Sequence, residues 1–160
     1  MHLTEVEKSM SKFSLERQTT IPENLASVFK FFEDPRNLKE ITPPWLSFQV
    51  VSASDEVMRQ GTKIRYKIRW LGLSMRWESL IAEYERDVRF ADEMLRGPYK
   101  SWYHVHEFKT VANGVEMFDR LEYALPFGPL GRLAHWLVVR RQLRAIFDYR
   151  EKRIRQIFTR

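Results

Sequence analysis

The sequence predicts an α+β fold, a curved antiparallel sheet of about seven strands wrapped around a long C-terminal helix, with two short helices after the first strand. Three observations support this prediction. Apolar and polar residues alternate in several segments between residues 13 and 125, as in half-buried strands. Prolines at positions 22, 35, 43 and 44 delimit two short helical segments. Neither proline nor glycine occurs from residue 132 to residue 160, so one long helix is expected there.

The first elements are a strand and two short helices. Residues 13–20 alternate and predict the strand. Pro22-Glu23-Asn24 begins a helix whose apolar residues recur at helical spacing: Leu25, Val28, Phe29 and Phe32. Asp34-Pro35 ends this helix, because the residue before a proline disfavours the helical conformation. The second helix is predicted over residues 36–41, followed by Pro43-Pro44.

The most regular strand is predicted at residues 62–70, after a short strand at 48–52. Its two faces are Ile64, Tyr66, Ile68 and Trp70 on one side and Lys63, Arg65, Lys67 and Arg69 on the other. A turn at residues 71–74 pairs Trp70 with Met75. That register places Trp77, Ser79 and Ile81 beside Ile68, Tyr66 and Ile64, and Glu78 opposite Lys67. The apolar groups therefore meet on the inner face.

Two further strands are predicted at residues 88–96 and 101–109, followed by a hairpin. Asn113-Gly114 is a strong hairpin signal. Taking these two residues as the turn pairs Ala112 with Val115 and so Phe108 with Asp119, His106 with Leu121 and His104 with Tyr123. The inner face then carries Trp102, His104, His106, Phe108, Met117, Leu121 and Tyr123, with Asp119 at its edge.

Residues 126–131 are predicted to form a rigid Pro/Gly link, and a helix of about 25 residues follows. Its apolar stripe is Val139, Leu143, Ile146, Phe147, Ile154 and Ile157. This helix is the only predicted element long enough to cover the inner face of the sheet. Because an antiparallel sheet twists and coils, one helix cannot fill the whole concavity, and we expect a cavity.

Composition indicates a folded protein without cysteine chemistry. We expect a flexible leader at residues 1–10 and one domain at 11–160. The chain is 44% hydrophobic and 14% aromatic, which argues against disorder. It has no cysteine, which excludes disulfides, thiolate nucleophiles and Cys-based metal sites. No signal peptide or membrane-spanning run is visible, so a soluble, cytoplasmic protein is expected.

Two runs of residues resemble a known family. They are the segment from Leu95 to Phe108, which contains Arg96-Gly97-Pro98-Tyr99, and the segment from Asp119 to Pro126. With the order of elements, they resemble the SRPBCC superfamily, which includes START, Bet v 1-like and polyketide cyclase/dehydrase proteins, and within it a bacterial ligand-binding subgroup. The resemblance extends from about Phe13 to Phe158. It implies the helix-grip fold and an internal cavity for a mainly apolar small molecule.

The inner face also carries the candidate site. His104 and His106 lie on one side of a strand, about 7 Å apart. The predicted register places Asp119 diagonal to His106, where a carboxylate could orient the imidazole for acid–base chemistry. An acid on the neighbouring strand could also reach His104. If residues are counted along that strand from the Gly97-Pro98 turn, this acid is Glu93; if they are counted from the Arg86-Asp87 turn, it is Asp92. Both alternatives stay open.

We expect the cavity to be lined by Tyr66, Ile68, Trp70, Trp77, Ile81, Glu93, Trp102, His104, His106, Phe108, Leu121, Tyr123, Leu143 and Phe147. Trp45 and Phe127 are candidates for its mouth. The same face is also compatible with a filled core in which both histidines are structural. No catalytic residue is assigned beyond the candidates His104, His106 and Asp119, and no metal or other cofactor is expected.

Positive charge is concentrated in the last helix. Residues 130–160 carry nine Lys or Arg against Asp148 and Glu151, a net charge of +7, so the remainder of the +6 chain sums to −1. Arg141, Arg144, Arg153 and Arg155 could contact an anionic membrane surface or an acidic protein. Nucleic acid is not expected, because no nucleic-acid-binding motif accompanies the charge. A solvated helix face is the simpler interpretation.

Three functions are compatible with these features. The sequence favours a carrier or sensor that binds a lipid-like or aromatic molecule without catalysis, because no nucleophile, phosphate loop or strong metal-ligand set is visible. The second is an enzyme resembling polyketide cyclases and aromatases, with His104 or His106 as the acid or base. The third is a module that delivers lipid at a membrane, or binds a protein, through the basic helix.

Overall fold

The computed structural model describes residues 12–70 and 72–159. The leader predicted at residues 1–10 lies outside the described residues. The elements are β1 (Phe13–Ile21), α1 (Leu25–Phe32), η1 (Pro35–Glu40), η2 (Pro44–Leu46), β2 (Gln49–Ala53), β3 (Lys63–Trp70), β4 (Leu73–Glu85), β5 (Arg89–Arg96), β6 (Ser101–Val111), β7 (Gly114–Ala124), α2 (Gly128–Ala134), η3 (His135–Val139) and α3 (Arg140–Phe158). η1 and η2 are 3₁₀ helices, and η3 is a π-helical turn between α2 and α3.

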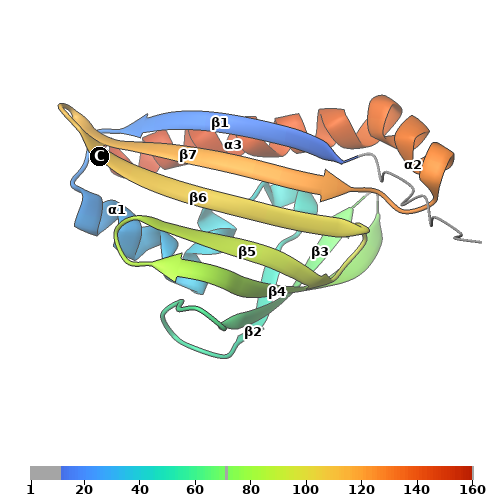
Figure 1. Cartoon of the computed structure of the whole chain (residues 1–160), viewed down its shortest axis with the longest axis horizontal. Helices are drawn as coiled ribbons and strands as arrows, with labels where there is room; N and C mark the ends of the chain where they lie inside the picture. Colours follow the sequence, from blue (N-terminus) through green and yellow to red (C-terminus); the bar gives the residue numbers. More distant parts are fainter. Residues whose placement is uncertain (1–11, 71, 160) are drawn as a thin grey trace, which may run out of the picture.

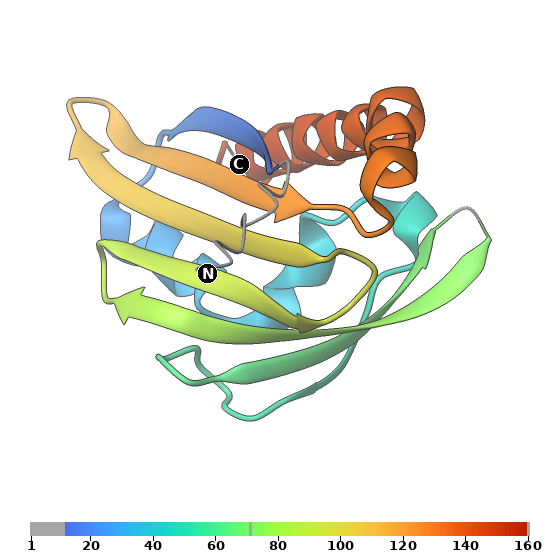
Figure 2. The same ribbon diagram turned by 45° about the vertical axis from the view of Figure 1, so that its right-hand side comes forward.

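The strands form one antiparallel sheet in the order β1-β7-β6-β5-β4-β3-β2. Figure 1 shows the curved sheet with α3 running along β1 and β7. Figure 2, turned by 45°, shows that α1 and the 3₁₀ helices lie on the same side of the sheet as α3. The predicted α+β architecture, a curved seven-stranded sheet wrapped around a long C-terminal helix, is confirmed. Within the described part of the chain, no helix combines the length and the apolar composition that a membrane span needs.

The inner face of the sheet buries two apolar clusters. The larger one joins α1 to the far ends of β6 and β7, where Phe29 packs edge-on against Phe90 and Phe108. The smaller one joins the other ends of β6 and β7 to the last helix, and its buried members are Leu121, Tyr123, Val139, Leu143 and Phe147. The two clusters are held apart by polar residues on β6 and β7, which are described below.

Both predicted hairpin registers are wrong by two residues. In β3–β4 the structure pairs Trp70 with Leu73, which places Tyr66 opposite Trp77. In β6–β7 it pairs Val111 with Gly114, so that the turn residues are 112 and 113. Because side chains alternate with a period of two, a shift of two residues leaves every side chain on its predicted face.

Gly114 explains the second error. It lies in β7 beside the end of β1, where a Cβ atom would collide with the backbone of Ile21 and Pro22. Glycine is therefore needed at this position for the close approach of two strands and not for the turn itself. Asn113-Gly114 does indicate a hairpin, but the turn residues are 112 and 113, one residue earlier than predicted.

The last helix begins earlier than predicted. Residues 126–131 were predicted as a link, but α2 starts at Gly128. Pro129 is compatible with this position, because the first turn of a helix does not use its backbone N–H groups. Gly131 is buried where a Cβ would strike the carbonyl oxygen of Pro126, so its glycine serves packing and does not break the helix.

We predict that Gly114→Ala lowers the free energy of unfolding by more than about 1 kcal/mol, because the methyl group meets backbone atoms that cannot move aside. Gly61→Ala is the matched control: its φ is also positive, at 91°, but no atom lies within 4 Å of the added Cβ. Urea denaturation of both variants measures the difference. Equal destabilisation would show that backbone conformation, and not the contact with β1, limits Gly114.

Candidate functional site

A cavity of about 240 Å³ lies between the inner face of the sheet and α3. Its walls come from β3, β4, β5, β6 and α3, with η1 and η2 closing one side. An engineered apolar cavity of roughly 150 Å³ is enough to bind benzene. The volume here therefore suffices for a ligand larger than one aromatic ring. The surrounding side chains are mainly aromatic and aliphatic, as is usual for small-molecule sites.

Three tryptophans supply much of the apolar wall. Trp70, Trp77 and Trp102 all line the cavity, and the rings of Trp77 and Trp102 meet edge-on with their centroids 5.0 Å apart. The indole nitrogen of Trp77 donates to Ser79 Oγ at 3.0 Å, and Ser79 Oγ also lies 3.0 Å from Tyr66 Oη. These bonds pair the polar side-chain atoms of Trp77, Ser79 and Tyr66 with one another.

A buried polar cluster forms another part of the wall. Asp119, 3% exposed, places its Oδ1 atom 2.7 Å from His106 Nδ1 and 3.1 Å from His104 Nε2. The two imidazole centroids are 3.9 Å apart. Arg150 of α3 approaches from the helix, with its Nη2 atom 3.8 Å from Asp119 Oδ1 and 3.4 Å from His106 Nδ1. This cluster occupies the space between the two apolar clusters of the core.

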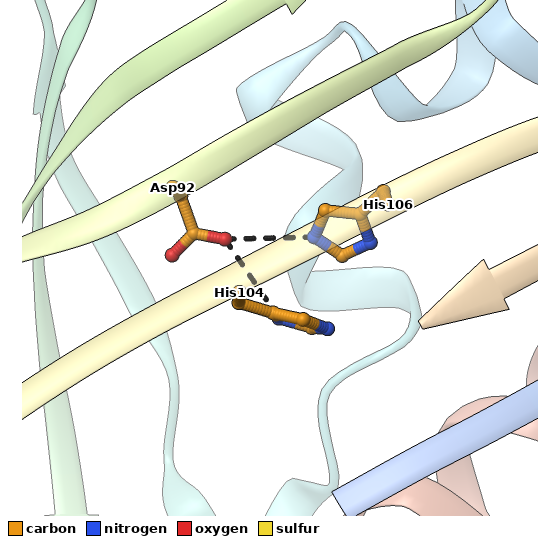
Figure 3. A group of neighbouring side chains, drawn as sticks. All are labelled: Asp92, His104 and His106. Atoms are coloured by element: carbon orange, nitrogen blue, oxygen red, sulfur yellow. Dashed lines mark ion pairs between the residues drawn. The ribbon is translucent and has the colours of Figure 1, made fainter. Parts of the chain in front are cut away.

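A second carboxylate faces the same histidines from β5. Asp92 Oδ2 lies 3.7 Å from His104 Nδ1 and 3.5 Å from His106 Nε2, and the three side chains converge in Figure 3. Each imidazole therefore has one nitrogen toward Asp119 and the other toward Asp92. Asp92, His104 and His106 offer three potential metal-ligating atoms that all lie within 4.8 Å of one another.

The surroundings of the two imidazoles shift their pKa values in opposite directions. Burial, together with the neighbouring His106, lowers the pKa of His104 to about 4. Burial also acts to lower the pKa of His106, but its contacts with Asp119 and Asp92 outweigh burial and raise this pKa above its ordinary value. For Asp119, burial is outweighed by the Arg150 charge and the two histidine contacts, which hold its pKa well below the usual range. The cluster thus favours one charged imidazole, on His106.

Of the two acids that could face His104, Asp92 is the one that does. Asp92 pairs with His104 and lines the cavity, whereas Glu93 pairs with Tyr103 and is exposed. The prediction that Glu93 lines the cavity is therefore wrong. In the pairing of β4 with β5, Leu95 is an extra residue that forms a β-bulge. A count of residues from the Gly97-Pro98 turn passes through this bulge, so it assigns the wrong face to the residues before Leu95.

Most of the other predicted lining residues do face the cavity: Tyr66, Ile68, Trp70, Trp77, Ile81, Trp102, His104, His106, Leu143 and Phe147. Phe108, Leu121 and Tyr123 share the predicted inner face but are buried in the two core clusters and do not line the cavity. Asp119 lies behind the histidines. At the predicted mouth, Trp45 packs edge-on against Tyr149, and Phe127 is 81% exposed beside α2; neither lines the cavity.

The sequence analysis missed several lining residues, among them Met75, Tyr99, Gln142, Ile146 and Arg150. Met75 and Ile146 were placed on the correct faces, so the signal was present. For Arg150, the sequence analysis considered only its contribution to the positive charge of the last helix. Its position one turn beyond the apolar Ile146 and Phe147 could have shown that it points inward.

The basic helix does not present its four predicted arginines equally. Arg153 donates to the carbonyl oxygen of Glu40 at 3.2 Å, and Arg155 pairs with Glu151 at 2.9 Å on the same helix. Arg141 and Arg144 are exposed. The sequence analysis did not predict that the chain just before these arginines exposes several large apolar residues, on α2, on η3 and just before α2: Phe127, Leu130, Leu133, Trp136 and Leu137.

We predict separate titrations for the two buried imidazoles. In chelator-treated protein, the ring nitrogens of His104 change protonation near pH 4, and those of His106 change above the ordinary histidine value. Between these limits His104 is neutral with one ring proton, whereas His106 carries both ring protons and a positive charge. Asp119→Asn lowers the pKa of His106, because burial then acts without that carboxylate. Long-range ¹H–¹⁵N spectra of the rings measure both values; identical titrations would contradict this assignment.

Comparisons with known proteins agree with this geometry. No curated protein matches the sequence. Among solved structures, Ara h 8.0201 superimposes with a TM-score of 0.61 at 15% identity, covering 90% of this chain and 98% of that one. Protein CV1439 from Chromobacterium violaceum gives 0.67 at 12% identity, with 91% and 96% covered. Ginseng major latex-like protein 151 from Panax ginseng gives 0.56 at 17% identity, with 84% and 96% covered. These likenesses show a shared fold.

The family model described as "Polyketide cyclase / dehydrase and lipid transport" matches residues 21–147. The match includes most of the sheet, the histidine pair and the first part of α3. It confirms the resemblance predicted from the sequence. The chain belongs to the polyketide cyclase/dehydrase and lipid transport family of the SRPBCC superfamily.

Proposed function

We propose that this protein binds a mainly apolar small molecule in its internal cavity, as a carrier or sensor. The observation that carries the proposal is the 240 Å³ space itself, walled by Trp70, Trp77 and Trp102 on the sheet and by Leu143 and Phe147 on α3. An empty apolar cavity of this size costs stability, because its lining atoms lack packing partners. A ligand with an aromatic or aliphatic body would supply those partners.

The polar cluster gives the ligand an orientation. Arg150 lines the cavity, and its buried Nε has no hydrogen-bond partner among the described residues. A buried donor without a partner costs about 1–3 kcal/mol. A ligand oxygen that accepts from Arg150 would remove this cost, while the apolar body lies toward the tryptophans. The proposed ligand is therefore apolar with one acceptor group at its end.

Blocking the cavity tests this proposal. Ile146→Trp places an indole in the space between α3 and the sheet, and Ala145→Trp places the same side chain on the exposed face of the same helix. With 2-naphthol as the probe, quenching of tryptophan fluorescence is expected for the wild type and Ala145→Trp. Affinity falls at least about tenfold in Ile146→Trp, a loss of about 1.4 kcal/mol. Thermal unfolding verifies that both variants are folded.

Native mass spectrometry of gently purified protein extends the same test to the natural ligand. A bound compound of constant mass that Ile146→Trp excludes would support the carrier or sensor. Equal probe binding by the wild type and both variants would contradict the proposal. If the isolated compound returns with a changed mass or isomer composition, and His106→Gln stops the change without loss of binding, acid–base catalysis by the His104/His106 pair replaces transport.

A second candidate function, docking on an anionic membrane surface, rests on a different observation. The exposed apolar residues Phe127, Leu130, Leu133, Trp136 and Leu137 follow one another closely in the chain. They belong to the segment that begins where β7 joins α2, at one end of the molecule (Figure 1). The exposed Arg141 follows Leu137 four residues later in the chain, so cations come directly after these apolar residues. An apolar face with an interfacial tryptophan and adjacent cations matches an anionic lipid surface.

We predict that the protein co-sediments with vesicles that contain phosphatidylserine, and that added salt weakens this binding. Leu137→Glu abolishes it, because a carboxylate replaces an apolar contact on the membrane side. Leu73→Glu is the matched control, since Leu73 is similarly exposed, 65% against 62%, but lies at the β3–β4 hairpin. Equal binding of the two variants, or self-association of the free protein through the apolar residues of α2 and η3, would contradict membrane docking.

A further inference from the structure

We propose that Asp92, His104 and His106 bind one divalent first-row transition metal ion, with the remaining coordination positions open to the cavity. The inference goes beyond ligand binding and does not depend on it. The three side chains come from neighbouring strands, Asp92 from β5 and the histidines from β6, and converge on one point at the cavity wall (Figure 3).

The spacing of the three atoms suits a metal better than it suits hydrogen bonds. Asp92 Oδ2 lies 3.5 Å from His106 Nε2 and 3.7 Å from His104 Nδ1, beyond the usual range of N–H···O bonds of about 2.7–3.2 Å. Zinc lies about 2.0–2.2 Å from nitrogen and carboxylate ligands, so its tetrahedral ligands are about 3.3 Å from one another. The three atoms all lie within 4.8 Å of one another, so the side chains would move closer together to close the arrangement around an ion.

The contacts with Asp119 leave ligating lone pairs on the other side of both rings. Asp119 Oδ1 is 2.7 Å from His106 Nδ1 and 3.1 Å from His104 Nε2, and an ionised carboxylate can only accept, so both of these nitrogens carry the proton. In the neutral tautomers, His104 Nδ1 and His106 Nε2 then present lone pairs toward Asp92. When His106 is neutral, three acceptors therefore face one another, and a cation between them removes the repulsion.

Asp119 has the position of an outer carboxylate. Metal-binding histidines generally donate their second N–H to a carboxylate, which fixes the ring and increases its basicity. Here one buried oxygen serves both rings, and Arg150, 3.8 Å away, balances its charge. The remaining negative charge, on Asp92, can be neutralised by a proton on His106 or by a metal ion, which compete for the same nitrogen.

The donor set indicates the kind of ion. Two imidazoles and one carboxylate suit Zn²⁺, Fe²⁺, Co²⁺ or Ni²⁺, whereas Mg²⁺ and Ca²⁺ prefer oxygen ligands alone. Three protein ligands leave at least one position free, as in catalytic sites. Because all three ligands line the cavity, a water molecule or an oxygen of a bound compound can occupy that position.

The test uses untagged full-length protein that has been stripped with a chelator and then titrated with Co²⁺. We expect one equivalent to bind with the visible absorption of a Co²⁺ site of low coordination number, Zn²⁺ to displace it, and Mg²⁺ to have no effect. Bound Zn²⁺ also raises the midpoint of thermal unfolding. None of these measurements requires a known substrate or reaction.

Matched variants assign the site. Asp92→Ala and His106→Gln abolish the Co²⁺ spectrum, whereas Glu93→Gln, the exposed neighbour, and His135→Gln, the buried histidine near α2, retain it. Asp119→Asn keeps the site but weakens it about 10–100-fold. Zn²⁺ stabilises the two control variants but not Asp92→Ala. Failure of the wild type to bind Co²⁺ or Zn²⁺ at micromolar concentration, or equal binding by Asp92→Ala and Glu93→Gln, would overturn the proposal.

Discussion

The buried carboxylate of Asp119 is the interaction on which the organisation of this protein depends. One of its oxygens contacts two imidazoles on β6 and faces a guanidinium on α3, so it connects two strands to the covering helix. Removal of one member of such a group leaves charges buried without partners, which typically costs about 3–5 kcal/mol. Asp119 also lies between the two apolar clusters, directly behind the histidines that line the cavity. The polar group and the cavity are therefore parts of one arrangement.

Much of this arrangement follows from local patterns in the chain. Alternation along β3 and β6 predicted which side of the sheet carries Tyr66, Trp102, His104 and His106. These predictions were unaffected by the register errors, because a shift of two residues preserves the face. The same shift did change the contacts: Asp119 is directly opposite His106 and not diagonal to it. Faces are encoded by sequence period, whereas registers depend on turns and on neighbouring strands.

The remaining errors have the same origin in tertiary contact. Leu95 looks like any other strand residue, and only its pairing with β4 makes it a bulge. Arg150 looks like one more cation on a basic helix until α3 is placed on the sheet. Phe108 and Leu121 face inward as predicted, but whether an inward side chain meets a cavity or another side chain depends on the helix opposite. The sequence period shows which face a side chain is on, but it contains no information on how closely the helix approaches that face.

The π turn of η3 has a consequence for the outer surface. Gly131, His135, Val139 and Leu143 are all buried at intervals of four residues. In an uninterrupted α-helix with about 3.6 residues per turn, that spacing would drift by roughly 120° over three intervals. One additional residue in a turn cancels about 100° of this drift, so the buried edge stays in line and the bulky leucines and Trp136 rotate outward. The exposure of these apolar side chains is thus set by the phase of the helix. Without the one additional residue, a different side of α2 would face the solvent.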